Sequence, residues 1–126
     1  MKVKGISWIG VGTGDFAGTL SFFTDILGLQ PAVVDERGVA LLSAGRQVVE
    51  LFGDGTRGRA LTSPPAIAFE VDDVAAARDE LLVKGVEVIG EIGAWNGFEW
   101  LYFRGPEGYV FAVKKTPADW ERATAQ

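Results

Sequence analysis

The side chains able to do chemistry in this chain are carboxylates, amines and hydroxyls, because its 126 residues include no cysteine and no histidine. Without histidine there is no imidazole base for a Ser-His-Asp triad, and without cysteine there is no thiolate nucleophile and no Cys-ligated zinc. The chain also lacks a Gly-x-Ser-x-Gly elbow and a phosphate-binding glycine loop. What remains is carboxylate and amine chemistry, or binding without chemistry.

Net charge and composition limit the classes of partner that the chain is expected to bind. The 12 Lys and Arg against 17 Asp and Glu give a net charge of −5, whereas nucleic-acid binding normally leaves a basic footprint. No stretch has the length or apolarity of a signal peptide or membrane span, so we expect a cytoplasmic protein without membrane or nucleic-acid partners. A hydrophobic share of 48% suits one folded domain over residues 1–126.

The elements that must position these side chains follow one plan twice. A strand-like run over residues 8–14 ends at Asp15, and a second over residues 66–72 ends at Asp73. Each aspartate is a good helix N-cap, because a carboxylate accepts the free N–H groups of the first turn. Apolar residues at helical spacing follow both, which predicts helices over about 16–27 and 74–82.

Three strand candidates follow each helix, bounded by glycine-rich turns. They cover residues 31–36, 39–43 and 47–52 in the first half, and 86–92, 98–104 and 109–114 in the second. The prediction is an α+β fold in which two βαβββ modules (about 5–53 and 66–115, joined by a linker over 54–65) form a curved mixed sheet around a cavity, with the helices outside. Residues 116–126 are expected to be a tail or a short helix, with Trp120 as its anchor.

Three local motifs carry a family resemblance. They are the first helix with its Leu27-Gly28-Leu29 end, the run IAFEVDDV over 67–74, and FRGPEG over 103–108. In this order and spacing the chain resembles the vicinal oxygen chelate superfamily, which includes glyoxalase I, the bleomycin-resistance proteins, fosfomycin-resistance enzymes and extradiol dioxygenases. Gly105 and Tyr109 depart from the family's usual acid and asparagine in the last motif.

The resemblance also implies where a metal would lie. Enzymes of the family hold one divalent ion with ligands from four strands, at positions that match Trp8, Glu50, Ala66 and Ala112 in this sequence. Only Glu50 among them can bind a cation, whereas tight sites normally need three or more protein ligands. The resemblance therefore implies no metal and no cofactor here.

Strand alternation predicts the inner face that surrounds the cavity. The predicted ligand-binding residues are Trp8, Glu50, Phe52, Ala66, Ala68, Trp100, Ala112 and Lys114. The small residues, together with Gly10, are expected to leave open volume beside aromatic walls. For the seventh strand two faces stay open, Phe98/Trp100/Tyr102 or Glu99/Leu101/Phe103.

Several of these residues have a second interpretation. Trp8 is as well suited to core packing as to stacking on a ligand. Glu50 can also be a remnant of the family's metal site that forms an ion pair with Lys114. Glu70 can simply be a solvated carboxylate at the end of a strand. Trp95 lies in an expected loop tip over 95–97.

The sequence leads to two candidate functions, and a third alternative remains. The resemblance favours a metal-free homodimer of the bleomycin-resistance type that sequesters an aromatic or cationic small molecule, such as an antibiotic. The alternative is a metal-independent lyase or isomerase with Glu50 as general base and Lys114 as its electrostatic partner. The third is a structural or regulatory relic whose cavity is filled by side chains.

Overall fold

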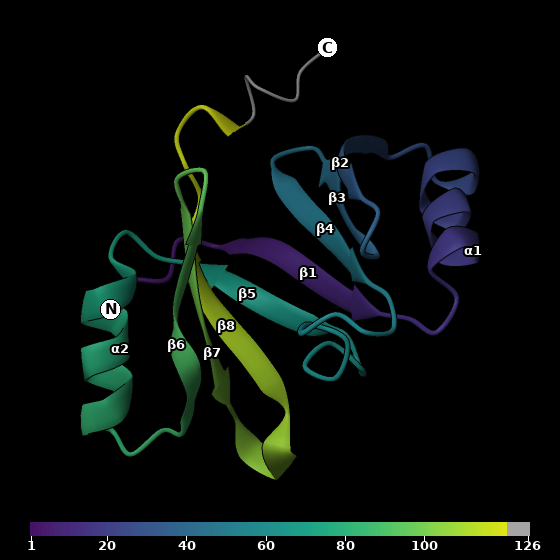
Figure 1. Cartoon of the computed structure of the whole chain (residues 1–126). Coiled ribbons are helices and arrows are strands. Elements are labelled where there is room, and N and C mark those ends of the chain that lie inside the picture. The colour runs from purple at the N-terminus through teal and green to yellow at the C-terminus, as the bar shows by residue number, and fades with distance from the viewer. Residues whose placement is uncertain (121–126) are drawn as a thin grey trace.

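The structure, a computed structural model, describes residues 1–120, in which eight strands form one mixed sheet (Figure 1). Their order across the sheet is β2-β3-β4-β1-β5-β8-β7-β6. The strands are β1 (Ile6–Gly12), β2 (Gln30–Asp35), β3 (Val39–Ala44), β4 (Gln47–Phe52), β5 (Ala66–Glu70), β6 (Val88–Trp95), β7 (Phe98–Arg104) and β8 (Val110–Lys115). The helices are α1 (Phe16–Ser21), continued by a π-helical turn (Phe22–Ile26), and α2 (Val74–Val83), and a short 3₁₀ turn (Pro106–Gly108) precedes β8.

The sheet consists of two four-stranded halves that meet at its centre. Strands β1–β4 make one half and β5–β8 the other, and within each half the first and last strands pair in parallel. The halves join where β1 runs antiparallel to β5, with Ile9 opposite Ile67. The predicted α+β fold with two βαβββ units is confirmed, and the two units pair within one chain.

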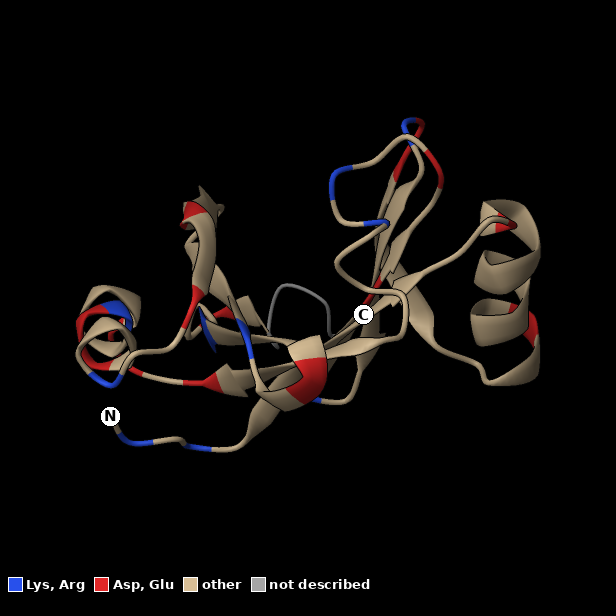
Figure 2. Ribbon diagram, turned by 90° about the horizontal axis from the view of Figure 1, so that it is seen from below, with Lys and Arg blue, Asp and Glu red and all other residues tan. Residues whose placement is uncertain are grey.

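Both helices lie on the outside of the curved sheet, as predicted. Figure 2 shows the halves rising as two arms, with α1 outside one and α2 outside the other. The predicted caps are present, because the Asp15 carboxylate accepts from the Gly18 backbone N–H at 3.0 Å and the Asp73 carboxylate from that of Ala76 at 2.9 Å. Apolar residues of each helix bury the outer sheet face, so the inner face is free to shape a cavity.

Two predicted elements need correction. The first helix changes to π-helical geometry after Ser21. The sixth strand is Val88–Trp95, later than the predicted 86–92, because Asn96 and Gly97 adopt positive φ angles of 48° and 86° and make a tight two-residue turn. Trp95 therefore ends the strand opposite Phe98 instead of lying in a loop tip.

The C-terminal segment returns to the inner side of the sheet. Trp120 is buried, and its indole packs edge-on against the Phe98 ring with centroids 5.0 Å apart. The helix expected toward residue 126 falls mostly on residues 121–126, outside the described part of the chain. Across residues 1–120, none of the helices combines the length and apolarity needed to cross a membrane.

Candidate ligand-binding site

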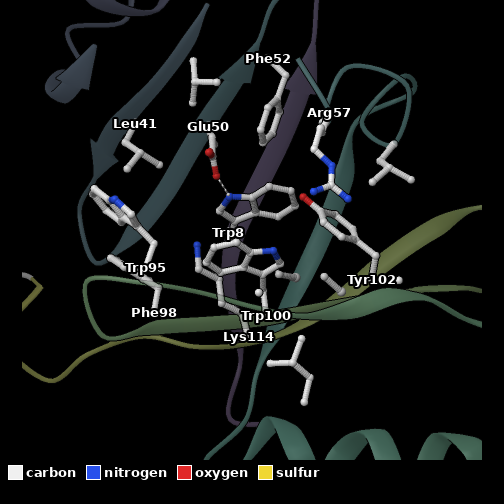
Figure 3. A pocket seen from close by; sticks show the side chains of 18 of the residues that line it. Trp8, Leu41, Glu50, Phe52, Arg57, Trp95, Phe98, Trp100, Tyr102 and Lys114 are labelled. Carbon is white, nitrogen blue, oxygen red and sulfur yellow. Dashed lines mark hydrogen bonds between the residues drawn. The ribbon is translucent and has the colours of Figure 1, made fainter. Parts of the chain in front are cut away.

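The inner face of the sheet encloses a cavity of about 670 Å³, drawn from close by in Figure 3. This volume lies within the range of about 300–1,000 Å³ that small-molecule sites occupy. Among the described residues, six aromatic side chains line it: Trp8, Phe52, Trp95, Phe98, Trp100 and Tyr102. Six charged residues of the same part of the chain also contribute to the lining: Asp35, Arg37, Glu50, Arg57, Glu91 and Lys114. The arrangement suits a flat apolar body with a polar group attached.

Trp8 of β1 forms the floor of this cavity. Its side chain is only 3% exposed and contacts Phe52 and Tyr102 edge-on, at centroid distances of 6.3 and 6.0 Å. The indole lies over Gly10, and any Cβ at this position would collide with the ring. A glycine is therefore required there to leave space for the indole. Trp8 thus has both roles weighed from the sequence, because it packs in the core and also lines the cavity.

Trp100 is a half-buried wall from β7. Its indole packs across Gly93 of the neighbouring strand β6, again at a position where a Cβ would clash with the ring. Phe98 and Tyr102 line the cavity beside it, whereas Leu101 is fully buried under α2. Of the two faces left open for this strand, Phe98/Trp100/Tyr102 is the inner one.

Glu50 of β4 places a carboxylate on the inner face. Its Oε1 accepts a hydrogen bond from Trp8 Nε1 at 2.8 Å. Burial raises its pKa, and the Trp8 hydrogen bond and the positive charge of Lys114 oppose that rise. A carboxyl group in this state can accept or hold a proton closer to neutral pH than an exposed one does.

Lys114 of β8 is a buried cation of the cavity, with 5% exposure. Its Nζ lies 4.7 Å from the centroid of the Phe98 ring and 5.4 Å from that of Trp8, which are cation–π distances. Burial lowers its pKa to about 8, against the attraction of Glu50 and Glu70. The expected direct ion pair with Glu50 is not formed, and the Glu50 carboxylate accepts a hydrogen bond from Trp8 instead.

Glu70 has a different role from the one expected. Its two carboxylate oxygens accept from the backbone N–H of Thr116 at 2.9 Å and from the Thr116 hydroxyl at 2.8 Å. Strand-end solvation is therefore the wrong interpretation, since this carboxylate ties the C-terminal segment to β5. Glu70 is absent from the cavity lining.

Seven of the eight predicted site residues line the cavity, and Ala66 does not. Ala66 is 1% exposed and lies opposite Gly10 on β1, where the Trp8 indole already fills the space. The open volume expected at Gly10 and Ala66 is therefore occupied. The cavity lies instead over Ala68 and Ala112, farther along the sheet.

Sequence reasoning missed the parts of the wall outside the four central strands. They are Val33, Asp35, Arg37, Val39 and Leu41 around β2 and β3, Arg57, Gly58 and Leu61 of the connecting segment, and Ile89–Gly93 of β6. The alternation rule, applied to β2 and β3, would have found Val33, Asp35, Val39 and Leu41. The connecting segment carries no such periodic signal.

The metal that the resemblance associates with this fold does not fit these residues. At the four implied positions the structure offers one carboxylate, and the Trp8 indole occupies the space at the first. The nearby ammonium of Lys114 would repel a cation. Within residues 1–120, no three Asp or Glu side chains gather as a metal-binding cluster would require.

The comparison with protein families agrees with this fold. Residues 5–113 match the family described as the Glyoxalase/Bleomycin resistance protein/Dioxygenase superfamily. The chain belongs to this superfamily. No curated protein matches the sequence.

Solved structures of the superfamily resemble the chain over most of its length. A variant of Streptomyces coelicolor methylmalonyl-CoA epimerase in complex with 2-nitronate-propionyl-CoA has a TM-score of 0.70 at 22% identity, covering 93% of this chain and 100% of that one. A superfamily member from Vibrio splendidus 12B01 has a TM-score of 0.65 at 16% identity, over 91% and 100%. A Mn(II)-bound glyoxalase from Novosphingobium aromaticivorans gives 0.71 at 25% identity, over 90% of this chain and 39% of that one. These likenesses establish the fold and leave the ligand to the site itself.

Proposed function

We propose that the protein is a metal-free small-molecule-binding protein that sequesters a flat aromatic ligand in the cavity over Trp8. The observation that carries this proposal is the ring of aromatic side chains around a volume of about 670 Å³. Aromatic walls with a few polar groups are typical of sites that bind small organic molecules. An antibiotic of this shape, as expected from the bleomycin-resistance branch, is one ligand that fits the proposal.

The cationic ligand expected from the sequence is less well supported. Glu50 is turned toward Trp8, and the ammonium of Lys114 lies close to the same indole. A ligand cation placed there would meet a like charge. The proposed ligand is therefore aromatic and not cationic.

The homodimer stays a prediction. The cavity is built from both halves of one chain, since β1 and β5 join them directly. Ligand binding as proposed does not depend on a second subunit to complete the walls.

Replacing Trp100 with alanine is expected to weaken binding of 2-naphthalenemethanol, a neutral flat probe, about tenfold, because one stacking wall is lost. Isothermal titration calorimetry measures the change. Phe22→Ala is the matched control, because Phe22 is 51% exposed on the outer side and lies away from the cavity lining. Equal affinities in the Trp100 variant and the wild type, or no saturable binding by the wild type, would overturn the proposal.

A second candidate is catalysis with Glu50 as general base. Its half-buried position, its raised pKa and its place on the cavity wall favour this function. The superfamily fold is shared with a methylmalonyl-CoA epimerase, so proton transfer at carbon is the reaction class to test.

Deuterium exchange separates the two candidates. The general-base function predicts that wild-type protein accelerates exchange at the acidic C–H bonds of 2-indanone in D₂O, followed by NMR, and that Glu50→Gln slows it by roughly 10²-fold or more. Glutamine keeps an acceptor for the Trp8 N–H but cannot take the proton. Exchange at the uncatalysed rate with wild-type protein would leave binding as the function.

A further inference from the structure

Lys114 is a buried ammonium that lacks a hydrogen-bond acceptor in the described part of the chain. Its side chain is 5% exposed, and its Nζ forms neither a hydrogen bond nor an ion pair with any residue among 1–120. The rings of Trp8 and Phe98 supply the direct contacts to this charge. An ammonium has three N–H donors, and Nζ is not fully enclosed by protein, so its donors face the cavity, where water or a ligand can accept them. The side chain lines the cavity, so a ligand can supply the missing acceptor.

The acidic residues on the strands around Lys114 form hydrogen bonds with other residues. On β4, Glu50 has one oxygen on the Trp8 N–H. On β5, Glu70 uses both oxygens to bind Thr116. On β7, Tyr102 is a neutral phenol whose pKa is raised by burial and by the charge of Glu50. Both acids attract Lys114 only across a distance.

The rim of the cavity adds a second positive group. The half-buried Asp35 and the exposed Arg37 pair with each other at 2.7 Å, and Glu91 is exposed on β6. Arg57 also lines the cavity, and Figure 3 shows its guanidinium on the same side as Tyr102. The lining of the cavity therefore includes the buried ammonium of Lys114 and the exposed guanidinium of Arg57.

Resting on the function proposed above, we propose that Lys114 anchors a carboxylate carried by the aromatic ligand, so that the cavity selects aromatic acids. The carboxylate accepts from Nζ in place of water, and the ring extends over Trp8 toward Trp100. A charge-assisted hydrogen bond of this kind is among the stronger polar contacts a site can make. Glu50 does not compete for Nζ, because its Oε1 accepts from the Trp8 N–H and it forms no ion pair with Lys114 within residues 1–120.

The test is a series of probes that share one ring system and differ in charge. Titration calorimetry near about pH 6.5 compares 2-naphthoate, 2-naphthalenemethanol and 2-naphthylmethylammonium. The wild type is expected to bind the carboxylate about tenfold or more tighter than the alcohol, and the alcohol tighter than the ammonium. Lys114→Met should abolish the preference for the carboxylate while keeping the alcohol affinity, and Lys114→Arg should retain most of it.

Lys115→Met is the matched control, because this neighbouring lysine is exposed and points to the opposite face of β8. It removes the same charge from the chain and should leave the preference unchanged. In the wild type the preference should also fall as the pH rises above the Lys114 pKa of about 8, where the ammonium loses its proton. That pH series keeps the proposal testable if the Lys114 variants do not fold.

The outcomes separate this inference from the proposed function. If 2-naphthalenemethanol binds saturably and 2-naphthoate binds no more tightly, Lys114 does not anchor a carboxylate. Binding of aromatic ligands would then still stand. Tightest binding of the ammonium probe would overturn it in favour of Glu50. Failure of all three probes to bind would overturn the proposed function and the inference together.

Discussion

Replacing Trp8 with alanine is expected to lower the free energy of unfolding by about 3–5 kcal/mol, the usual range for deleting a large buried aromatic side chain. Trp8 is 3% exposed, touches Phe52 and Tyr102, and covers Gly10, so no neighbouring side chain can fill the gap without a shift. The change also removes the hydrogen-bond donor to the Glu50 carboxylate. Urea unfolding followed by circular dichroism measures the loss.

Two variants separate packing from hydrogen bonding at this position. Trp8→Phe keeps a ring over Gly10 but loses the N–H that donates to the Glu50 carboxylate. The free energy of unfolding is expected to fall by about 1–3 kcal/mol, because that carboxylate is left without its donor. Trp95→Ala removes an indole that is 41% exposed and should lower stability by much less than Trp8→Ala. A Trp8→Ala protein as stable as the wild type would show that the indole is not the floor of the site.

Replacing Lys114 with methionine is expected to raise the free energy of unfolding near about pH 7 by about 1–3 kcal/mol, because burial lowers the Lys114 pKa to about 8 and so destabilises its charged form. Methionine keeps most of the stem's apolar contacts and removes the penalty of burying an ammonium that lacks an acceptor among residues 1–120. The cation–π contacts with Trp8 and Phe98 are lost and offset part of the gain. Urea denaturation of both proteins under identical conditions measures the difference.

The sign of the pH dependence follows from the lowered pKa. The pKa of Lys114 is about 8 in the folded protein and near 10.5 in the unfolded chain. Between these values the unfolded chain binds the extra proton, so this residue's destabilising effect is full below about pH 8 and fades as the pH approaches 10.5. The advantage of Lys114→Met should shrink over the same window, whereas Lys115→Met should show no such trend. A destabilised Lys114→Met protein at neutral pH would mean that the ammonium has a partner that stabilises it.

The repeated architecture was readable from the sequence because its signals are local. Asp15 and Asp73 cap their helices through short hydrogen bonds within three residues, and such caps leave a clear pattern in the chain. Alternation along β4 and β8 placed Glu50 and Lys114 on the same face. These rules depend on neighbours in sequence, and the structure follows them.

The cavity itself depends on contacts that sequence does not encode locally. β7 is apolar on both faces, so its pattern could not decide whether Trp100 or Leu101 points inward. Ala66 was included because it shares a face with Ala68, but the rotamer of Trp8 decides which of the two positions stays open. The Glu50 carboxylate bonds the Trp8 indole and not Lys114, a contact between distant parts of the chain that no local pattern contains.

A crystal structure of the protein with 2-naphthoate shows whether Lys114 anchors a carboxylate in the cavity over Trp8. We predict that the naphthalene ring lies in the cavity between Trp8 and Trp100, with a carboxylate oxygen within hydrogen-bond distance of Lys114 Nζ. A cavity closed by side chains, a probe bound on the outer surface, or a carboxylate turned away from Lys114 would contradict the account.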